Sequence, residues 1–234
     1  MLAIIKRELS SYFNSAIGYI VLGVFYFFSG MFFYVYCLYY DSSSLSPVFS
    51  QMLTIIIFLI PLITMKSFSE EKRNKTDQAL LTAPVSLFEI VMGKFLAAFT
   101  LYALCNAIFL LYALFIALFT APDWIILFTT LLGMLLMGAA LIAIDLFISA
   151  LTESQAVAAI FSIGVGLVIY LIDSLASLIN VDFLKNLFYS ISFNRSFSPF
   201  TNGIINLSSV LFFISVAAIF LFLCARVFEK RRWS

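Results

Sequence analysis

Six long apolar stretches alternate with short polar turns along the chain. They cover residues 17–40, 48–65, 95–120, 125–151, 156–178 and 207–227. A helix needs about 20 residues to cross the hydrocarbon core of a bilayer, and each stretch comes close to or exceeds that length. Because backbone groups in that core must be paired within the segment, each stretch is expected to be helical. The pattern predicts an all-α integral membrane protein with six transmembrane helices.

Two further segments are amphipathic instead of continuously apolar. In residues 1–14 the apolar positions fall on one helical face, with Lys6 and Arg7 on the other. This predicts an interfacial helix, and a frayed start of the first span is the alternative. Residues 179–206 are too polar to span and too apolar for a free loop. They predict interfacial helices or a re-entrant hairpin on the outer side, within a single transmembrane domain covering 1–234.

The longest polar interruption, residues 65–94, separates the second and third spans. Positions 66–77 hold seven of the chain's 25 charged residues. The loop also carries two helix-start signals. Ser67 with Glu70, and Ser86 with Glu89, each have the spacing of a capping box. Pro84 ends the first helix, so the loop predicts a helix of about 14 residues, a break, and a second helix running into the third span.

The basic residues fall mainly on one side of this topology. The N-terminal segment, the loop and the C-terminal tail hold 11 of the 13 Lys and Arg residues, and only Lys185 and Arg195 fall on the other side. The positive-inside rule therefore places both termini and the loop in the cytoplasm. A net charge of +1 leaves no basic face for nucleic acid, which excludes that class of partner.

The chemistry of an enzyme is missing from the sequence. Histidine, the commonest general base and zinc ligand, is absent. The only Gly-Lys pair, Gly93-Lys94, lacks the Walker A context, so the chain has no P-loop for ATP. Three cysteines lie singly in apolar stretches without metal-binding spacing: Cys37, Cys105 and Cys224. We expect no enzymatic activity, no metal and no cofactor in this chain.

Two carboxylates fall inside the predicted spans. A charged group at that depth is costly and is a candidate for function. Asp145 lies close to the inner end of the fourth span, where water is expected to reach it, and Asp173 lies near the hydrated outer end of the fifth. On this topology they lie toward opposite faces of the membrane, too far apart to share a proton as a protease pair would.

The loop has an ordered motif, an acidic-basic cluster followed by Leu-Leu-Thr-Ala-Pro-Val and then Gly-Lys-Phe. Its residues are Phe68, Glu70, Glu71, Lys72, Arg73, Thr76, Leu80, Leu81, Thr82, Ala83, Pro84, Val85, Glu89, Ile90, Gly93, Lys94 and Phe95. In this motif, and in residues 148–158, the chain resembles the permeases of ABC-2 type transporters, especially the GldF-type subset. Lys75 stands where many members have glycine. Lysine continues a helix better than glycine, so we expect the first loop helix to be straighter here.

The resemblance implies a permease subunit of an exporter in the bacterial cytoplasmic membrane. Its partners would be a second permease subunit, identical or related, and two separate ATP-binding subunits that hold ATP and magnesium. Residues 68–83 would form a coupling helix in a cleft of the ATPase, and residues 152–155 a secondary contact. The candidate coupling residues are Phe68, Glu70, Glu71, Lys72, Arg73, Thr76, Leu80, Leu81, Ala83, Pro84, Thr152, Glu153 and Gln155.

Other readings stay open on the residues alone. The loop could be a solvated, positive-inside connection. The chain could be a stand-alone secondary transporter or channel, or a membrane scaffold that transports nothing. A secondary transporter is expected to show paired intramembrane charges or broken helices in matching halves, and Asp145 and Asp173 offer little of that. The cargo is not specified, because abundant phenylalanine suits a lipid-like substrate and a lipid-facing surface equally well.

Overall fold

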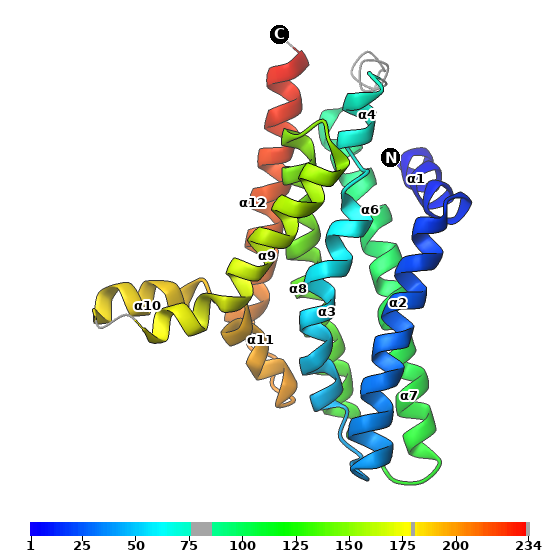
Figure 1. Ribbon diagram of the computed structural model, residues 1–234. Coiled ribbons are helices and arrows are strands. Elements are labelled where there is room, and N and C mark those ends of the chain that lie inside the picture. The colour runs from blue at the N-terminus through cyan, green and yellow to red at the C-terminus, as the bar shows by residue number, and fades with distance from the viewer. Residues whose placement is uncertain (76–85, 179–180, 233–234) are drawn as a thin grey trace.

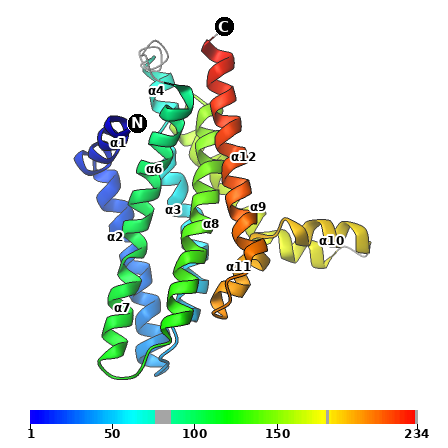
Figure 2. The same cartoon turned by 180° about the vertical axis from the view of Figure 1, so that it is seen from behind.

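The structure confirms the prediction of six membrane spans. The computed structural model describes residues 1–75, 86–178 and 181–232, and the described part is helical without a strand. Six helical segments in it are long and apolar enough to cross a membrane: Ala16–Tyr39, Ser46–Arg73, Leu87–Ala117, Trp124–Leu151, Gln155–Ser177 and Leu207–Lys230. They form an elongated bundle (Figure 1), and α10 projects from its side in both views (Figures 1 and 2).

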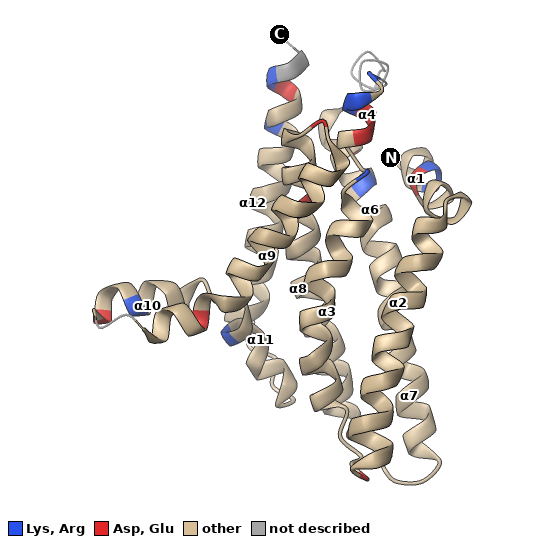
Figure 3. Ribbon diagram, in the orientation of Figure 1, with Lys and Arg blue, Asp and Glu red and all other residues tan. Residues whose placement is uncertain are grey.

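The individual helices divide these spans more finely. Their bounds are α1 Leu2–Asn14, α2 Ala16–Phe33, the π-helix η1 Tyr34–Tyr39, α3 Ser46–Thr64, α4 Ser69–Arg73, α6 Leu87–Asn106, α7 Ile108–Ala117, α8 Trp124–Leu151, α9 Gln155–Ser177, α10 Asp182–Ser190, α11 Phe193–Thr201 and α12 Leu207–Arg232. The N-terminus, α4 and the end of α12 lie at the same end of the bundle (Figure 1). Charged residues gather at that end, with a second group around α10 and α11 (Figure 3).

The N-terminal helix α1 is separate from the first span. Ser15 has an extended backbone that breaks the helix, and the chain turns sharply into α2. A Cβ at Gly18 would lie 2.6 Å from the carbonyl oxygen of Tyr12, so only glycine fits this turn without a shift. The buried Tyr12 hydroxyl donates to the carbonyl of Ile63 in α3 at 3.1 Å. Helix α1 is therefore fixed against the second span.

The third span is broken once. It consists of α6 and α7, which meet at Ala107. The hydroxyl of Tyr26 in α2 donates to the carbonyl of Leu104 at 3.1 Å, next to the break. Asn106 is buried, and its amide donates to the carbonyl of Tyr102 at 2.8 Å. Neighbouring side chains thus satisfy backbone groups in the membrane interior near this irregular point.

Helix α8 is the centre of the bundle and packs against α3, α6, α9, α11 and α12. Small residues permit this close packing. A Cβ at Gly138 would lie 2.1 Å from the Tyr102 ring, and one at Gly133 would lie 2.7 Å from the Phe200 ring. Phe200 belongs to α11, whose three buried phenylalanines pack into the bundle, whereas α10 buries no residue. The segment before the last span thus forms two short helices.

Candidate functional site

The second span continues through a turn into α4, at the charged end of the bundle. The first residue of α4 is Ser69, and Phe68 stands at the N-cap position without a side-chain cap. The backbone amides of Phe68 and Ser69 donate to the hydroxyl of Ser149 in α8, at 3.2 and 3.3 Å. A serine from another helix therefore caps α4. The predicted capping box of Ser67 with Glu70 is wrong.

Helix α4 is shorter than the sequence predicted. It ends at Arg73, and Lys75 has φ 55°, in the left-handed region that glycine favours. The expectation of a straighter helix at Lys75 is therefore wrong, because its left-handed backbone follows the end of α4. Five candidate coupling residues lie outside the described residues: Thr76, Leu80, Leu81, Ala83 and Pro84.

The second capping box is confirmed. The amide of Glu89 donates to the Ser86 hydroxyl at 3.2 Å, and the amide of Ser86 donates to the Glu89 carboxylate at 3.3 Å. This cap fixes the first turn of α6 outside the apolar stretch. Lys94 follows two turns later on the same helix.

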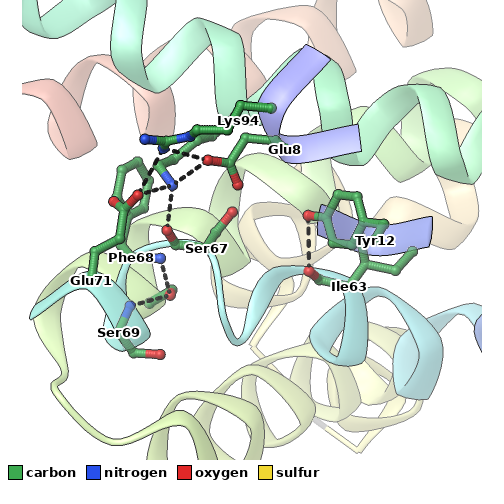
Figure 4. A network of polar contacts seen from close by, with 10 residues as sticks. Glu8, Tyr12, Ile63, Ser67, Phe68, Ser69, Glu71 and Lys94 are labelled. Carbon is green, nitrogen blue, oxygen red and sulfur yellow. Dashed lines mark hydrogen bonds and ion pairs between the residues drawn. The ribbon is translucent and has the colours of Figure 1, made fainter. Parts of the chain in front are cut away.

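Lys94 is the buried centre of a charged network (Figure 4). Its side chain is 1% exposed, and its ammonium lies 3.0 Å from the Glu8 carboxylate of α1 and 2.9 Å from that of Glu71 in α4. It also donates to the carbonyl of Ser67 at 2.6 Å and lies 5.1 Å from the centre of the Phe68 ring. Two carboxylates, one carbonyl and an aromatic face together compensate the desolvation of this single cation.

Arg7 extends the network to solvent. Its guanidinium donates to Glu8 at 2.6 Å and to Glu71 at 2.9 Å. Burial alone would lower the pKa of Arg7, but hydrogen bonds and charge attraction from these carboxylates raise it above its ordinary value. Arg7 is therefore a permanent cation. Two cations, from α1 and α6, share two carboxylates, from α1 and α4, so these three helices are joined at one point.

Two other candidate coupling residues also point inward. Phe68 is 1% exposed, and its ring centre lies 4.6 Å from that of Phe228 in α12. Lys72 is buried, and its ammonium donates to the carbonyl of Ala150 in the last turn of α8. A cation there also complements the negative end of the α8 dipole. Both side chains attach α4 to the transmembrane helices.

The remaining described candidates lie nearer the surface. Arg73 and Glu153 are exposed, whereas Glu70, Thr152 and Gln155 are partly buried. Helix α4 packs against both α8 and α9, and Thr152 and Glu153 lie in the turn between those two helices. The structure thus brings together two elements that lie about 80 positions apart in the sequence.

The residues that sequence reasoning missed are Arg7, Glu8, Lys94 and Ser149. Lys94 carried a weak signal, because a lysine two turns into an apolar helix must find an anion. Ser149 carried none, since its partners lie 80 and 81 positions away.

Of the two intramembrane carboxylates, Asp145 differs from expectation. Asp145 is 5% exposed and buried within α8, so the expectation that water reaches it is wrong. The Asp173 side chain is partly buried, and its carboxylate lies 3.8 Å from the guanidinium of Arg195 in α11. The guanidinium also lies 3.3 Å from the centre of the Tyr189 ring. Asp173 therefore belongs to an ion pair in the outer segment.

These features define an integral membrane protein with several spans. It combines six membrane-spanning helices with a charged helical element braced against them at one end. Residues 2–233 match the family model described as ABC-2 family transporter protein, so the chain belongs to that family. No curated protein matches the chain. Family membership makes it the transmembrane permease of an ABC transporter and implies an ATP-binding partner.

Proposed function

We propose that this chain couples ATP hydrolysis by separate ATPase subunits to export across the bacterial cytoplasmic membrane. It resembles the GldF-type subset, and both termini and α4 are cytoplasmic. It pairs with a second permease subunit, identical or related, and with two ATP-binding subunits that hold ATP and magnesium. The chain itself catalyses no reaction.

One observation carries the coupling proposal. Helix α4 and the turn between α8 and α9 lie together at the charged end of the bundle. These elements contain the two groups of residues that resemble the family's ATPase contacts. A partner that bound both elements would contact the ends of α3, α8 and α9 at the same time. Helix α4 itself has five residues and is too short to cross the membrane.

Exposure divides the candidate residues into two roles. Arg73 and Glu153 are exposed and would contact the ATPase, together with the partly buried Glu70, Thr152 and Gln155. Phe68, Glu71 and Lys72 point inward and would transmit force. The candidates outside the described residues remain proposed contacts: Thr76, Leu80, Leu81, Ala83 and Pro84.

Two paths lead from α4 into the membrane. One runs through Ser149 and the Ala150 carbonyl into α8, the central helix of the bundle. The other runs through Glu71 and Lys94 into α6, and through the shared carboxylate of Glu8 into α1. A partner shifts a conformational equilibrium only by contacting two states differently. If α4 moved on ATPase binding, the contacts along both paths would differ between the two conformations of the permease.

Reconstitution with the cognate ATPase tests this proposal. R73E and E153K should weaken ATPase binding by about tenfold, because they reverse exposed charges at the centre of the proposed contact. E71Q should leave ATPase binding intact and lower the stimulation of ATP turnover, because it alters the transmitting network. L80A should reduce both. K6E, at an exposed lysine of α1, is the matched control.

Two results would contradict the proposal. One is full ATPase binding and turnover in R73E, E153K and L80A. The other is transport by the chain without ATP, which would make it a secondary transporter.

A further inference from the structure

A cavity of about 380 Å³ lies beside the Lys94 network. It opens between α1, the start of α2, and the segment that joins α3 to α4. Ile17 and Ile63, at the ends of the first two spans, form its apolar part. Polar side chains from α1, from the segment between α3 and α4, from α4 and from α6 form most of the rest. Because it lies where two apolar spans meet the charged end of the bundle, its opening is at the depth of lipid headgroups.

The cavity contains charges of both signs. Three cations and three carboxylates line it. Four of them, Arg7, Glu8, Glu71 and Lys94, are bound to one another in the network. The other two are Lys66 and Glu70, which are partly buried and form no ion pair among the described residues. One cation and one anion are therefore available in the same cavity.

A third group in the wall also lacks a partner. The hydroxyl of Ser67 lines the cavity in a residue that is 5% exposed, and it forms no hydrogen bond. A buried hydroxyl without a partner costs free energy, so such a group points to a missing polar ligand. Ser67 lies directly after Lys66, so hydroxyl and ammonium approach the cavity from the same segment.

We propose that this cavity binds the headgroup of a zwitterionic phospholipid that carries a primary ammonium, phosphoethanolamine. Lys66 binds the phosphate, with the Ser67 hydroxyl donating to it. Glu70 accepts hydrogen bonds from the ammonium. Balanced charges disfavour a simple anion, because Glu70 would repel it. The acyl chains lie along the apolar spans that carry Ile17 and Ile63.

The headgroup chemistry makes a selective prediction. A choline headgroup has the same charges, but its quaternary ammonium cannot donate a hydrogen bond to Glu70. A glycerol headgroup has the phosphate and no cation. The binding order should therefore be phosphatidylethanolamine above phosphatidylcholine and phosphatidylglycerol. This inference does not depend on the proposed ATPase coupling, because it is measured on the permease alone.

Thermal unfolding of the purified chain in detergent, titrated with each lipid, tests the site. Among the three lipids, phosphatidylethanolamine should raise the midpoint temperature of unfolding most. K66Q and E70Q should each weaken the apparent affinity of the chain for this lipid by about tenfold. K6Q and D182N remove exposed charges that do not line the cavity and should bind the lipid as the wild type does. The comparison of lipids uses the wild-type chain, so it stands even if a variant fails to fold.

Two outcomes overturn the proposal. Equal stabilisation by all three lipids would mean that the headgroup is not recognised. Unchanged binding of phosphatidylethanolamine to K66Q and E70Q would place its site elsewhere. Water-soluble phosphoethanolamine tests whether the bound headgroup belongs to a lipid or to a soluble molecule. If it stabilises the chain as strongly as the lipid at equal concentration, the ligand is a soluble metabolite and the lipid assignment fails.

Discussion

The ammonium of Lys94 lies 2.9 Å from the carboxylate of Glu71, and it joins the helix that begins the third span to the short helix that follows the second. The pair is almost enclosed, with the lysine side chain 1% exposed and the glutamate side chain 17% exposed. The same cation lies 3.0 Å from Glu8 in α1. Movement of α4 cannot leave α6 and α1 unaffected unless this contact breaks.

Replacing Lys94 should be among the most damaging single changes at this end of the molecule. K94M keeps the length of the side chain but leaves Glu8 and Glu71 without their buried cation. Breaking a buried ion pair costs about 3–5 kcal/mol, and Arg7 still pairs with both carboxylates, so we expect a loss of about 2–3 kcal/mol. Unfolding by sodium dodecyl sulfate, followed by circular dichroism in detergent, measures this free energy.

The triple variant E8Q/E71Q/K94M separates charge imbalance from lost packing. It removes both uncompensated carboxylates, so it should recover at least about half of the stability lost in K94M. K6M, which changes an exposed lysine in α1, should alter stability by less than about 0.5 kcal/mol. If the triple variant is as unstable as K94M, electrostatic compensation is not what makes Lys94 important.

The cap that Ser149 supplies to α4 gives a second prediction. S149A removes the acceptor of two backbone amides in a fully buried position, and it should cost about 1–2 kcal/mol. S67A is the matched control, because the Ser67 hydroxyl forms no hydrogen bond and its removal should cost much less. The same denaturation measurement compares the two. Equal losses would mean that Ser67 contributes to the cap.

The six spans could be predicted from sequence because burial in lipid imposes a rule on every residue of a span. Residues 125–151 are apolar almost throughout, and α8 runs over Trp124–Leu151. The Ser86–Glu89 cap could also be predicted, since both partners lie within one turn. The cap is determined by residues within one helical turn, and the spans are determined by contact with lipid.

The candidate site depended on contacts that local patterns do not contain. Ser67 has the spacing of a cap, but Ser149 takes the role from another helix. Lys75 favours helix by propensity, yet its backbone is left-handed at the end of α4. Glu71 and Lys72 read as exposed loop charges, and both are held by tertiary partners. Long-range packing decided each of these features.

At Lys75 and at Lys6, replacement of lysine by glycine is expected to change the stability of the protein in opposite directions. K75G removes the strain of a lysine in the left-handed region, which costs roughly 1–2 kcal/mol. Glycine also loses more backbone entropy on folding, which offsets part of this gain, so we expect a net stabilisation of about 0.5 kcal/mol. K6G places glycine inside α1 and should cost about 1 kcal/mol. Denaturation in detergent measures both. A loss in K75G would mean that the chain does not hold the left-handed turn in solution.

Gly93 determines how closely α1 approaches α6. A Cβ at this position would lie 2.8 Å from the Ile4 side chain of α1, so G93A should push α1 away from the helix that carries Lys94. Overpacking of this kind costs about 1–3 kcal/mol. Because Lys6 and Arg7 are in α1, their cleavage by trypsin should become faster in G93A, and the pairing of Glu8 with Lys94 should weaken.

G23A is the control, since a Cβ at Gly23 meets nothing within 4 Å and alanine favours helix. Unchanged cleavage and stability in G93A would show that α1 can shift along α6 without loss, and such a helix could not carry force from α4.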